Sequence, residues 1–338
     1  MSSIKIINPG LYTTIQDLGR FGFQQYGMPV SGAMDEFAFR IGNILAGNWQ
    51  NTPAIEFTYT GLTVEFQNSA HIAITGGDFI VSTDKGDHIP CWSTLYIEGG
   101  TTLSISSILS GCRGYLCIYG GFDIPKVMGS ASTYLRAKIG GLNGHLIKAG
   151  DEIPYLPQEG VPPSRLLPKA FIQKWYSSNS PIRVIMGPQD EAFTTEGIQN
   201  FLTGEYSVTK DADRMGYRLS GPPIAHKTGP DIISDGIAIG SIQVPGNGMP
   251  VIMLAERQTT GGYTKIATVI TVDLPRLSQS IPGNILRFIP VSIEEGHTLL
   301  KEFYSDIDFI DSMTYKSNKK YYSIQVKNKT FKVIVEEI

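Results

Sequence analysis

The chain has 338 residues, of which 41% are hydrophobic and 17% are charged, and its formal net charge is −3. This composition is too apolar for a mainly disordered protein, and the small negative charge argues against a nucleic-acid partner. The chain has three cysteines, and none of them form a CxxC pair. It has no run of close to 18 apolar residues, and its first ten residues show no signal-peptide pattern. We therefore expect a reduced, cytoplasmic protein with no metal site and no membrane contact.

Short β-branched and aromatic runs separated by glycine turns predict a β-rich N-terminal lobe over residues 1–155. Its expected strands are residues 64–66, 71–75, 94–98, 102–108 and 115–119. One amphipathic helix is predicted over residues 33–46, with Ser31 as its N-cap and Gly47 at its end.

Five prolines between Pro154 and Pro168 predict a connector, taken as residues 156–180, because proline removes a backbone donor and favours extended geometry. A second β lobe is expected over residues 181–292, with one helix near residues 195–203. Its expected strands are residues 182–186, 237–244, 251–254 and 267–272.

The final segment, residues 293–338, is predicted to hold a helix and a hairpin. The helix opens with a capping box formed by Ser292 and Glu295, and the hairpin follows from alternating apolar residues around a turn at 327–329. Six lysines and no acid lie between Lys316 and Lys332. They either keep an edge strand soluble or form a docking patch for an acidic partner.

Several common catalytic motifs are missing from the sequence. It contains no P-loop, no HExxH and no GxSxG, and its five histidines are scattered singly. No lysine lies between methionines as in a biotin-attachment site. If biotin takes part, it must arrive on another chain.

Two polar clusters lie near the predicted N-terminal helix. Gln16, Asp17 and Arg20 occupy a glycine-punctuated loop, where an Asp17–Arg20 ion pair could pin the loop or the three could line a site. Ser31 and Asp35 suit the positive end of the helix dipole, and this capping role explains both, with a catalytic role for Asp35 as the alternative.

Two further clusters lie in the C-terminal lobe. Asp213, Arg214 and Arg218 flank a turn and predict either carboxylate or phosphate binding or a solvated ion pair. The other cluster surrounds a di-glycine that is expected to form a concave anion nest, unless the segment is only a polar hairpin turn. Its members are Gln243, Gln258, Thr259, Thr260, Gly261, Gly262, Tyr263 and Lys265.

Seven motifs together resemble one family, which comprises the C subunit of 5-oxoprolinase, the KipI antagonists (KipA) and the carboxyltransferase-domain proteins related to urea amidolyase. They are residues 9–20, 31–35, 120–123, 129–134, 213–219, 240–246 and 257–263. The resemblance implies a mainly β fold of two barrel-like lobes, the second similar to cyclophilin, with a few short covering helices.

The resemblance also implies an enzyme component that is inactive alone. It would act with a KipI-like B subunit, together with an A subunit, in the ATP-dependent cleavage of 5-oxoproline to glutamate, with the nucleotide pocket shared between these chains. One alternative is a biotin-dependent carboxyltransferase subunit that acts on urea or a similar amide. Another is a regulatory KipI antagonist without catalysis.

Combining motifs and chemistry assigns roles to individual residues. Arg214 and Arg218 would hold a carboxylate or phosphate, and Asp213, Asp235 or Lys265 would move a proton or supply charge. Hydrogen bonds to an amide or phosphoryl group would stabilise the negative charge that develops there. The remaining candidate binding residues are Gln243, Gln258, Thr259, Thr260, Gly261, Gly262, Tyr263, Gln16, Asp17 and Arg20.

Overall fold

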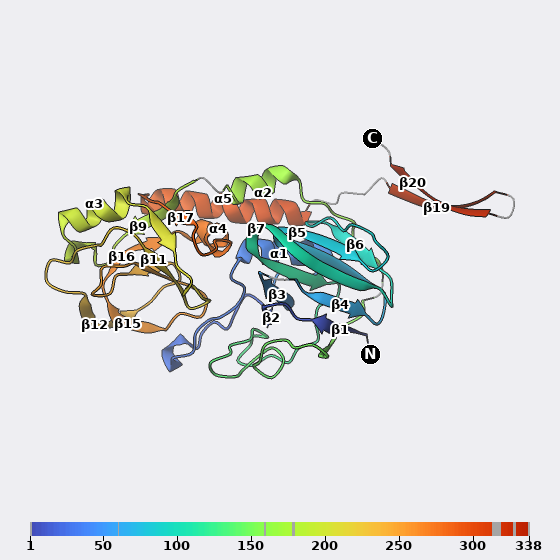
Figure 1. Ribbon diagram of the computed structural model, residues 1–338, viewed down its shortest axis with the longest axis horizontal. Coiled ribbons are helices and arrows are strands. Elements are labelled where there is room, and N and C mark those ends of the chain that lie inside the picture. Colours follow the sequence, from blue (N-terminus) through green and yellow to red (C-terminus); the bar gives the residue numbers. More distant parts are fainter. Residues whose placement is uncertain are drawn as a thin grey trace.

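Two large, mostly antiparallel sheets of eight strands each form the two lobes of the molecule (Figure 1). The computed structural model describes residues 2–59, 61–158, 160–177 and 180–312, and the backbone of two strands at 319–326 and 329–336. The first sheet is a half-barrel and the second is a nearly closed barrel. The expectation of a mainly β fold with two barrel-like lobes is therefore confirmed.

The N-terminal sheet has the order β2-β3-β7-β4-β1-β8, and β5 pairs with both β6 and β7. Its strands are β1 (Ser3–Asn8), β2 (Tyr12–Gln16), β3 (Ala54–Thr58), β4 (Thr63–Phe66), β5 (Ala70–Thr83), β6 (Thr94–Ile97), β7 (Thr102–Ile118) and β8 (Glu152–Pro154). The predicted strands at 102–108 and 115–119 are one continuous strand. Register shifts between β5 and β7 bend this part of the sheet.

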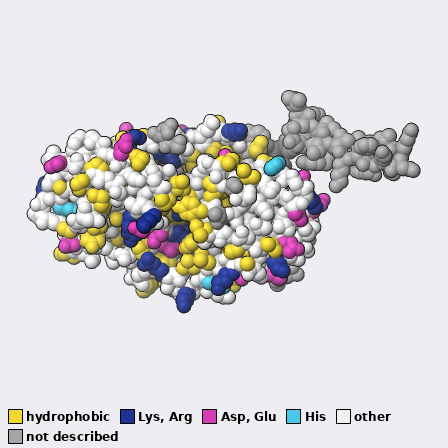
Figure 2. Space-filling model, in the orientation of Figure 1, with side chains coloured by type: hydrophobic (Ala, Val, Ile, Leu, Met, Phe, Trp, Pro, Cys, Tyr) yellow, Lys and Arg dark blue, Asp and Glu magenta, His cyan; other side chains and the backbone are white. Residues whose placement is uncertain are grey.

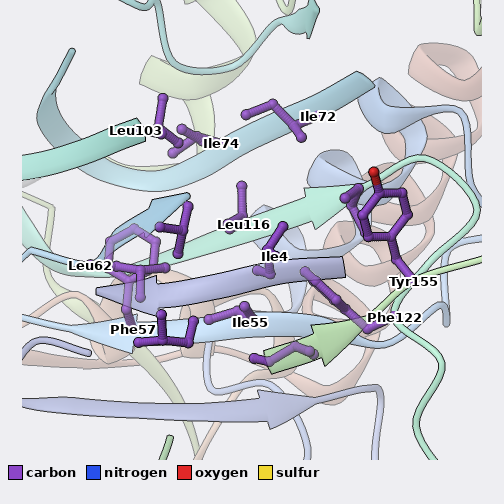
Figure 3. Close-up of a cluster of buried hydrophobic side chains, with 14 of the residues drawn as sticks. Ile4, Ile55, Phe57, Leu62, Ile72, Ile74, Leu103, Leu116, Phe122 and Tyr155 are labelled. Carbon is purple, nitrogen blue, oxygen red and sulfur yellow. The ribbon is translucent and has the colours of Figure 1, made fainter. Parts of the chain in front are cut away.

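The bent sheet encloses an apolar core, shown in Figure 3. The side chains come from several strands and point toward one another, and Ile4, Ile55, Leu62 and Leu116 are fully buried. Burying each such side chain contributes about 1.5–3 kcal/mol, so this core supplies much of the lobe's stability.

The C-terminal barrel has the order β17-β10-β11-β14-β13-β16-β9-β18. Its strands are β9 (Ile182–Met186), β10 (Tyr206–Val208), β11 (Gly216–Ser220), β13 (Ser241–Gln243), β14 (Val251–Met253), β16 (Lys265–Val269), β17 (Ile285–Leu286) and β18 (Phe288–Pro290). The strand expected at 237–244 is limited to β13. A separate ribbon of β12 (Asp231–Gly236) and β15 (Thr260–Tyr263) lies beside the barrel.

Helix α1 (Glu36–Ala46) begins later than its sequence pattern predicts. Asp35, not Ser31, is its N-cap, because the Asp35 carboxylate accepts a hydrogen bond from the Ala38 amide at 2.9 Å. Ser31 instead lies in the irregular segment before the helix, where its φ of 58° is in the left-handed region. Gly47 ends the helix in a left-handed conformation, as expected.

The other helices are α2 (Lys169–Trp175), α3 (Thr195–Thr203), α4 (Leu274–Ser278) and α5 (Ile293–Ser312). The capping box of α5 is confirmed, since Glu295 N donates to Ser292 Oγ at 3.1 Å and Ser292 N donates to Glu295 Oε2 at 2.8 Å. Helix α5 runs along both lobes in Figure 1 and packs against α1. None of the described helices has the length and apolarity that a membrane crossing needs.

The predicted terminal hairpin is confirmed in the backbone. Strand β19 (Lys319–Val326) pairs antiparallel with β20 (Lys329–Glu336). Its lysine side chains lie outside the described residues, so both interpretations of the lysine-rich segment stay predictions. The connector predicted at 156–180 contains helix α2.

A candidate site between two interlocked lobes

A buried arginine from the C-terminal lobe reaches into the N-terminal lobe. Arg214 is 5% exposed, and its Nε donates to Glu256 Oε1 at 2.6 Å and its Nη2 to the Gly32 carbonyl at 2.6 Å. Its Nη1 donates to Glu56 of β3, which also accepts from the Tyr115 hydroxyl at 2.7 Å. Burial opposes the charge, but the two glutamates raise the pKa of Arg214 above its usual value. The carboxylates that Arg214 holds are thus the chain's own.

A second buried arginine makes the reciprocal contact. Arg113 of β7 donates from Nη1 to the Tyr217 hydroxyl at 2.6 Å and to the Ser278 carbonyl, both in the C-terminal lobe. Beside it, Gln279 Oε1 accepts from the amides of Cys112 and Arg113, each at 2.9 Å. The lobes are therefore held together by polar groups buried on both sides.

Asp35 lies fully buried in the same interface. Its carboxylate accepts hydrogen bonds from Gln279 Nε2 at 2.6 Å, from the Tyr176 hydroxyl at 2.8 Å and from Ala38 N at 2.9 Å. Burial raises the pKa of Asp35 to about 6 from its ordinary 3.8, although these hydrogen bonds oppose the rise.

This raised pKa predicts a specific pH dependence of stability. Between about pH 4 and pH 6 the folded chain binds a proton at Asp35 more readily than the unfolded chain does. The contribution of Asp35 to the free energy of unfolding is therefore fully present below pH 4 and is lost as the pH rises through about 6. The loss is about 3 kcal/mol at most. In urea denaturation from pH 4 to 7, the wild type should lose stability relative to Asp35→Asn. If the free energies of unfolding of the two proteins changed equally with pH, the raised pKa of Asp35 would be contradicted.

A hollow of about 410 Å³ lies where the lobes meet. Its lining comes from both lobes and consists of Gly27, Pro29, Tyr134, Arg136, Met215, Glu256, Arg257, Gln258, Thr259 and Thr260. In Figure 1 the loop at 21–28 (blue) lies at the lower edge between the two lobes, near the loop at 125–145 (green), which lies below the N-terminal sheet. Figure 2 shows charged side chains gathered at the lower middle of the same face.

Asp17 and Arg20, which belong to the first predicted cluster, bind the loop that carries Tyr134 of the hollow. Asp17 Oδ1 accepts from the hydroxyls of Ser130 and Ser132, both at 2.6 Å, and its Oδ2 accepts from Ala131 N at 2.7 Å. Arg20 donates to the carbonyls of Val127 at 3.2 Å and Ser132 at 2.7 Å. The two residues therefore hold the loop at 127–134, and the expected direct Asp17–Arg20 ion pair does not form.

Gln16 belongs to the same support. Its Nε2 donates to the Thr133 carbonyl at 3.3 Å and to the Thr14 hydroxyl at 3.0 Å. Because Thr133 precedes Tyr134, this contact fixes the start of the segment that lines the hollow. Gln16, Asp17 and Arg20 are all buried, and none of them is among the lining residues.

Three predicted binding residues, Gln258, Thr259 and Thr260, do line the hollow. The expected anion nest at Gly261 and Gly262 is wrong, because both lie in strand β15 and neither has a positive φ, which a nest requires.

Gly261 instead permits close packing. A Cβ there would lie 2.7 Å from Ile237 Cδ1 and 2.8 Å from Gln243 Nε2. Gln243 is 6% exposed, and its Nε2 has no hydrogen-bond partner in the described part of the chain. Tyr263, at the end of the same strand, is 42% exposed.

Lys265 and Asp235 form an ion pair next to the hollow. Lys265 Nζ lies 2.6 Å from Asp235 Oδ2, and the lysine side chain is 2% exposed whereas the aspartate side chain is 55% exposed. The hydrogen bond from Lys265 lowers the pKa of Asp235. Since Asp235 pairs with Gly261 across the ribbon, the pair anchors β12 to the barrel beside Thr260.

The Asp213–Arg218 cluster does not gather around one ligand. Asp213 Oδ1 accepts from the amides of Met215 and Gly216 at 2.8 and 3.0 Å, which closes a surface turn. Arg218 is exposed and donates to the Asp211 carbonyl at 3.0 Å. Arg214 points the other way, into the lobe interface.

Seven of the ten lining residues were not predicted as site residues from sequence, and four of these carry polar or charged side chains, namely Tyr134, Arg136, Glu256 and Arg257. Tyr134 ends one of the seven family motifs and Arg257 begins another, so membership in a motif was the available signal. Glu256 directly precedes Arg257, whereas nothing in the sequence singles out Arg136.

Comparison with known proteins agrees with this architecture. A family model described as "Carboxyltransferase domain, subdomain A and B" matches residues 26–290. The C subunit of 5-oxoprolinase from Escherichia coli is 38% identical over 293 residues, covering 87% of this chain and 93% of that protein. Its counterpart in Haemophilus influenzae is 37% identical over 311 residues, with coverages of 90% and 96%.

A solved structure shares the fold. The urea amidolyase of K. lactis superimposes with a TM-score of 0.85 at 28% identity over 92% of this chain. The match spans only 20% of that much longer chain. From the family match and the nearly full-length identity to two relatives, the chain belongs to the family of carboxyltransferase-domain proteins with subdomains A and B.

Proposed function

We propose that the chain is the C subunit of a cytoplasmic, ATP-dependent 5-oxoprolinase and acts with a KipI-like B subunit, together with an A subunit. The observation that carries this proposal is identity of 37–38% to two proteins of that name across 93–96% of their length. Because the similarity extends over almost the whole length, it includes both lobes and the junction between them.

The hollow offers chemistry suited to a small cyclic amide. Gln258, Thr259 and Thr260 supply neutral donors and acceptors that can bind an amide group and stabilise charge on its oxygen. Lys265 and Asp235 lie beside them as a candidate pair for proton transfer. A second polypeptide would cover the open side and exclude water.

ATP enters this proposal as a co-substrate of the whole complex. The sequence contains no P-loop, and we place none of the nucleotide's atoms on this chain. The isolated chain is accordingly proposed to be inactive.

A second candidate function is a biotin-dependent carboxyltransferase subunit. It is favoured by the TM-score of 0.85 to a urea amidolyase and by the family match. The biotin would come on another chain, because this sequence lacks a recognisable attachment lysine.

Reconstitution separates these functions. The purified chain is mixed with the A and B subunits and tested for glutamate formation from 5-oxoproline with and without ATP. In parallel it is mixed with a biotin carboxylase and a biotinylated carrier and tested for carboxylation of urea. ATP-dependent glutamate supports the first proposal, and carboxylation of urea alone overturns it in favour of the second. Binding to the KipI-like B subunit without either reaction would indicate a regulatory protein.

A further inference from the structure

Arg257 is a half-buried cation on the wall of the hollow. Its Nε donates to the Ile237 carbonyl at 2.9 Å and its Nη1 to the Leu254 carbonyl at 3.3 Å, while its Nη2 makes no hydrogen bond within the described chain. No carboxylate among the described residues lies within ion-pair distance of it. Burial lowers the pKa of Arg257 to about 10.

Other enclosed arginines of the C-terminal lobe are neutralised within the fold. Arg214 meets Glu56 and Glu256, and both Arg183 and Arg276 meet Asp273. A cation removed from water is costly unless an anion compensates it. Arg257 therefore presents an uncompensated charge where a ligand can reach it.

A second arginine faces the same hollow from the other lobe. Arg136 is exposed and makes neither a hydrogen bond nor an ion pair with any described residue. Glu256 is the acid among the lining residues, and it is already bound to Arg214. The hollow thus carries an excess of positive charge contributed by both lobes.

We propose that Arg257, assisted by Arg136, binds the carboxylate of the substrate and selects carboxylate-bearing cyclic amides over neutral amides. The guanidinium group suits this role, because it can offer parallel donors to both oxygens of a carboxylate. A ligand held in this way places its ring amide next to Gln258–Thr260, the adjacent residues of the chain. The inference rests on the proposed function and adds the group of the substrate that this chain recognises.

The kinetic test uses the reconstituted complex of all three subunits. Arg257→Gln should raise the KM for 5-oxoproline about 10- to 100-fold with a much smaller change in kcat, because a charge-assisted hydrogen bond to the bound substrate is lost. Arg136→Gln should raise KM by a smaller factor. Inhibition by 2-pyrrolidinone, the same ring without a carboxylate, should not change in either variant. Arg287→Gln, an exposed arginine paired with Glu205, serves as the matched control.

An equilibrium test separates this inference from the proposed function. Binding of 5-oxoproline and of 2-pyrrolidinone is measured by NMR titration of the isolated chain and of its complex with the B subunit. Preferential binding of 5-oxoproline that is lost in Arg257→Gln supports the inference even if no glutamate is ever formed. If Arg257→Gln does not fold, Arg257→Lys and Arg136→Gln decide. Equal affinity for both probes, absence of binding to every sample, or an unchanged KM in the variants overturns it.

Discussion

Replacing Arg214 by methionine should lower the free energy of unfolding by about 3–5 kcal/mol, as expected when one partner of a buried ion pair is removed. The substitution leaves Glu56 and Glu256 buried without their cation, and it also removes the hydrogen bond to Gly32. Since folded proteins are stable by only about 5–15 kcal/mol, the loss is a large share of the total. Urea denaturation at pH 7 measures it.

Arg287→Met is the matched control, because Arg287 pairs with Glu205 on the surface and its side chain is 59% exposed. Its loss should cost less than about 1 kcal/mol. If Arg214→Met is as stable as this control but inactive in the complex, Arg214 serves a ligand and not the lobe interface.

Replacing Asp17 by alanine should have a comparably large effect on both stability and activity. The change leaves the Ser130 and Ser132 hydroxyls and the Ala131 amide without their acceptor, and each unsatisfied buried group costs about 1–3 kcal/mol. We expect a loss of about 3–5 kcal/mol in the free energy of unfolding, measured by urea denaturation. Because the freed loop carries Tyr134, kcat/KM of the complex should also fall about 100-fold at temperatures where the variant is folded.

Asp151→Ala is the matched control for Asp17→Ala, because Asp151 also accepts a backbone hydrogen bond in a loop. Asp151 accepts a hydrogen bond from Lys148 N at 2.8 Å in an exposed turn, so its replacement should cost less than about 1 kcal/mol. Near-normal activity of a folded Asp17→Ala protein would show that the loop at 127–134 does not shape the site.

Local rules were enough to predict the elements whose patterns are strong. The capping box at Ser292 and Glu295, the Gly47 helix end and the terminal hairpin all depend on neighbouring residues, and the structure contains each of them. Strand β2 was missed because it contains Thr13, Thr14 and Gln16, which are typical of a polar loop. Their side chains are buried by packing against distant segments, which a local pattern does not report.

The site was only partly predictable for a related reason. Gln258, Thr259 and Thr260 were identified because hydrogen-bonding residues are concentrated in that stretch. The direction in which a charged side chain points depends on the other lobe, however. Arg214 turns inward because Glu56, which is 158 residues away in sequence, lies opposite it, whereas Arg257 has no such acid and stays at the hollow.

The reciprocal insertion of Arg113 and Arg214 has a consequence for ligand entry. Each of the two arginine side chains binds groups of the opposite lobe. A hinge motion that separated the lobes would therefore leave both buried guanidinium groups without partners across the lobe interface, which is costly. Under the proposed function, entry and enclosure of a small molecule would then depend on peripheral loops and on the surface of the proposed B subunit. This chain would then supply one rigid, preformed side of the site, and a separate polypeptide would supply the other.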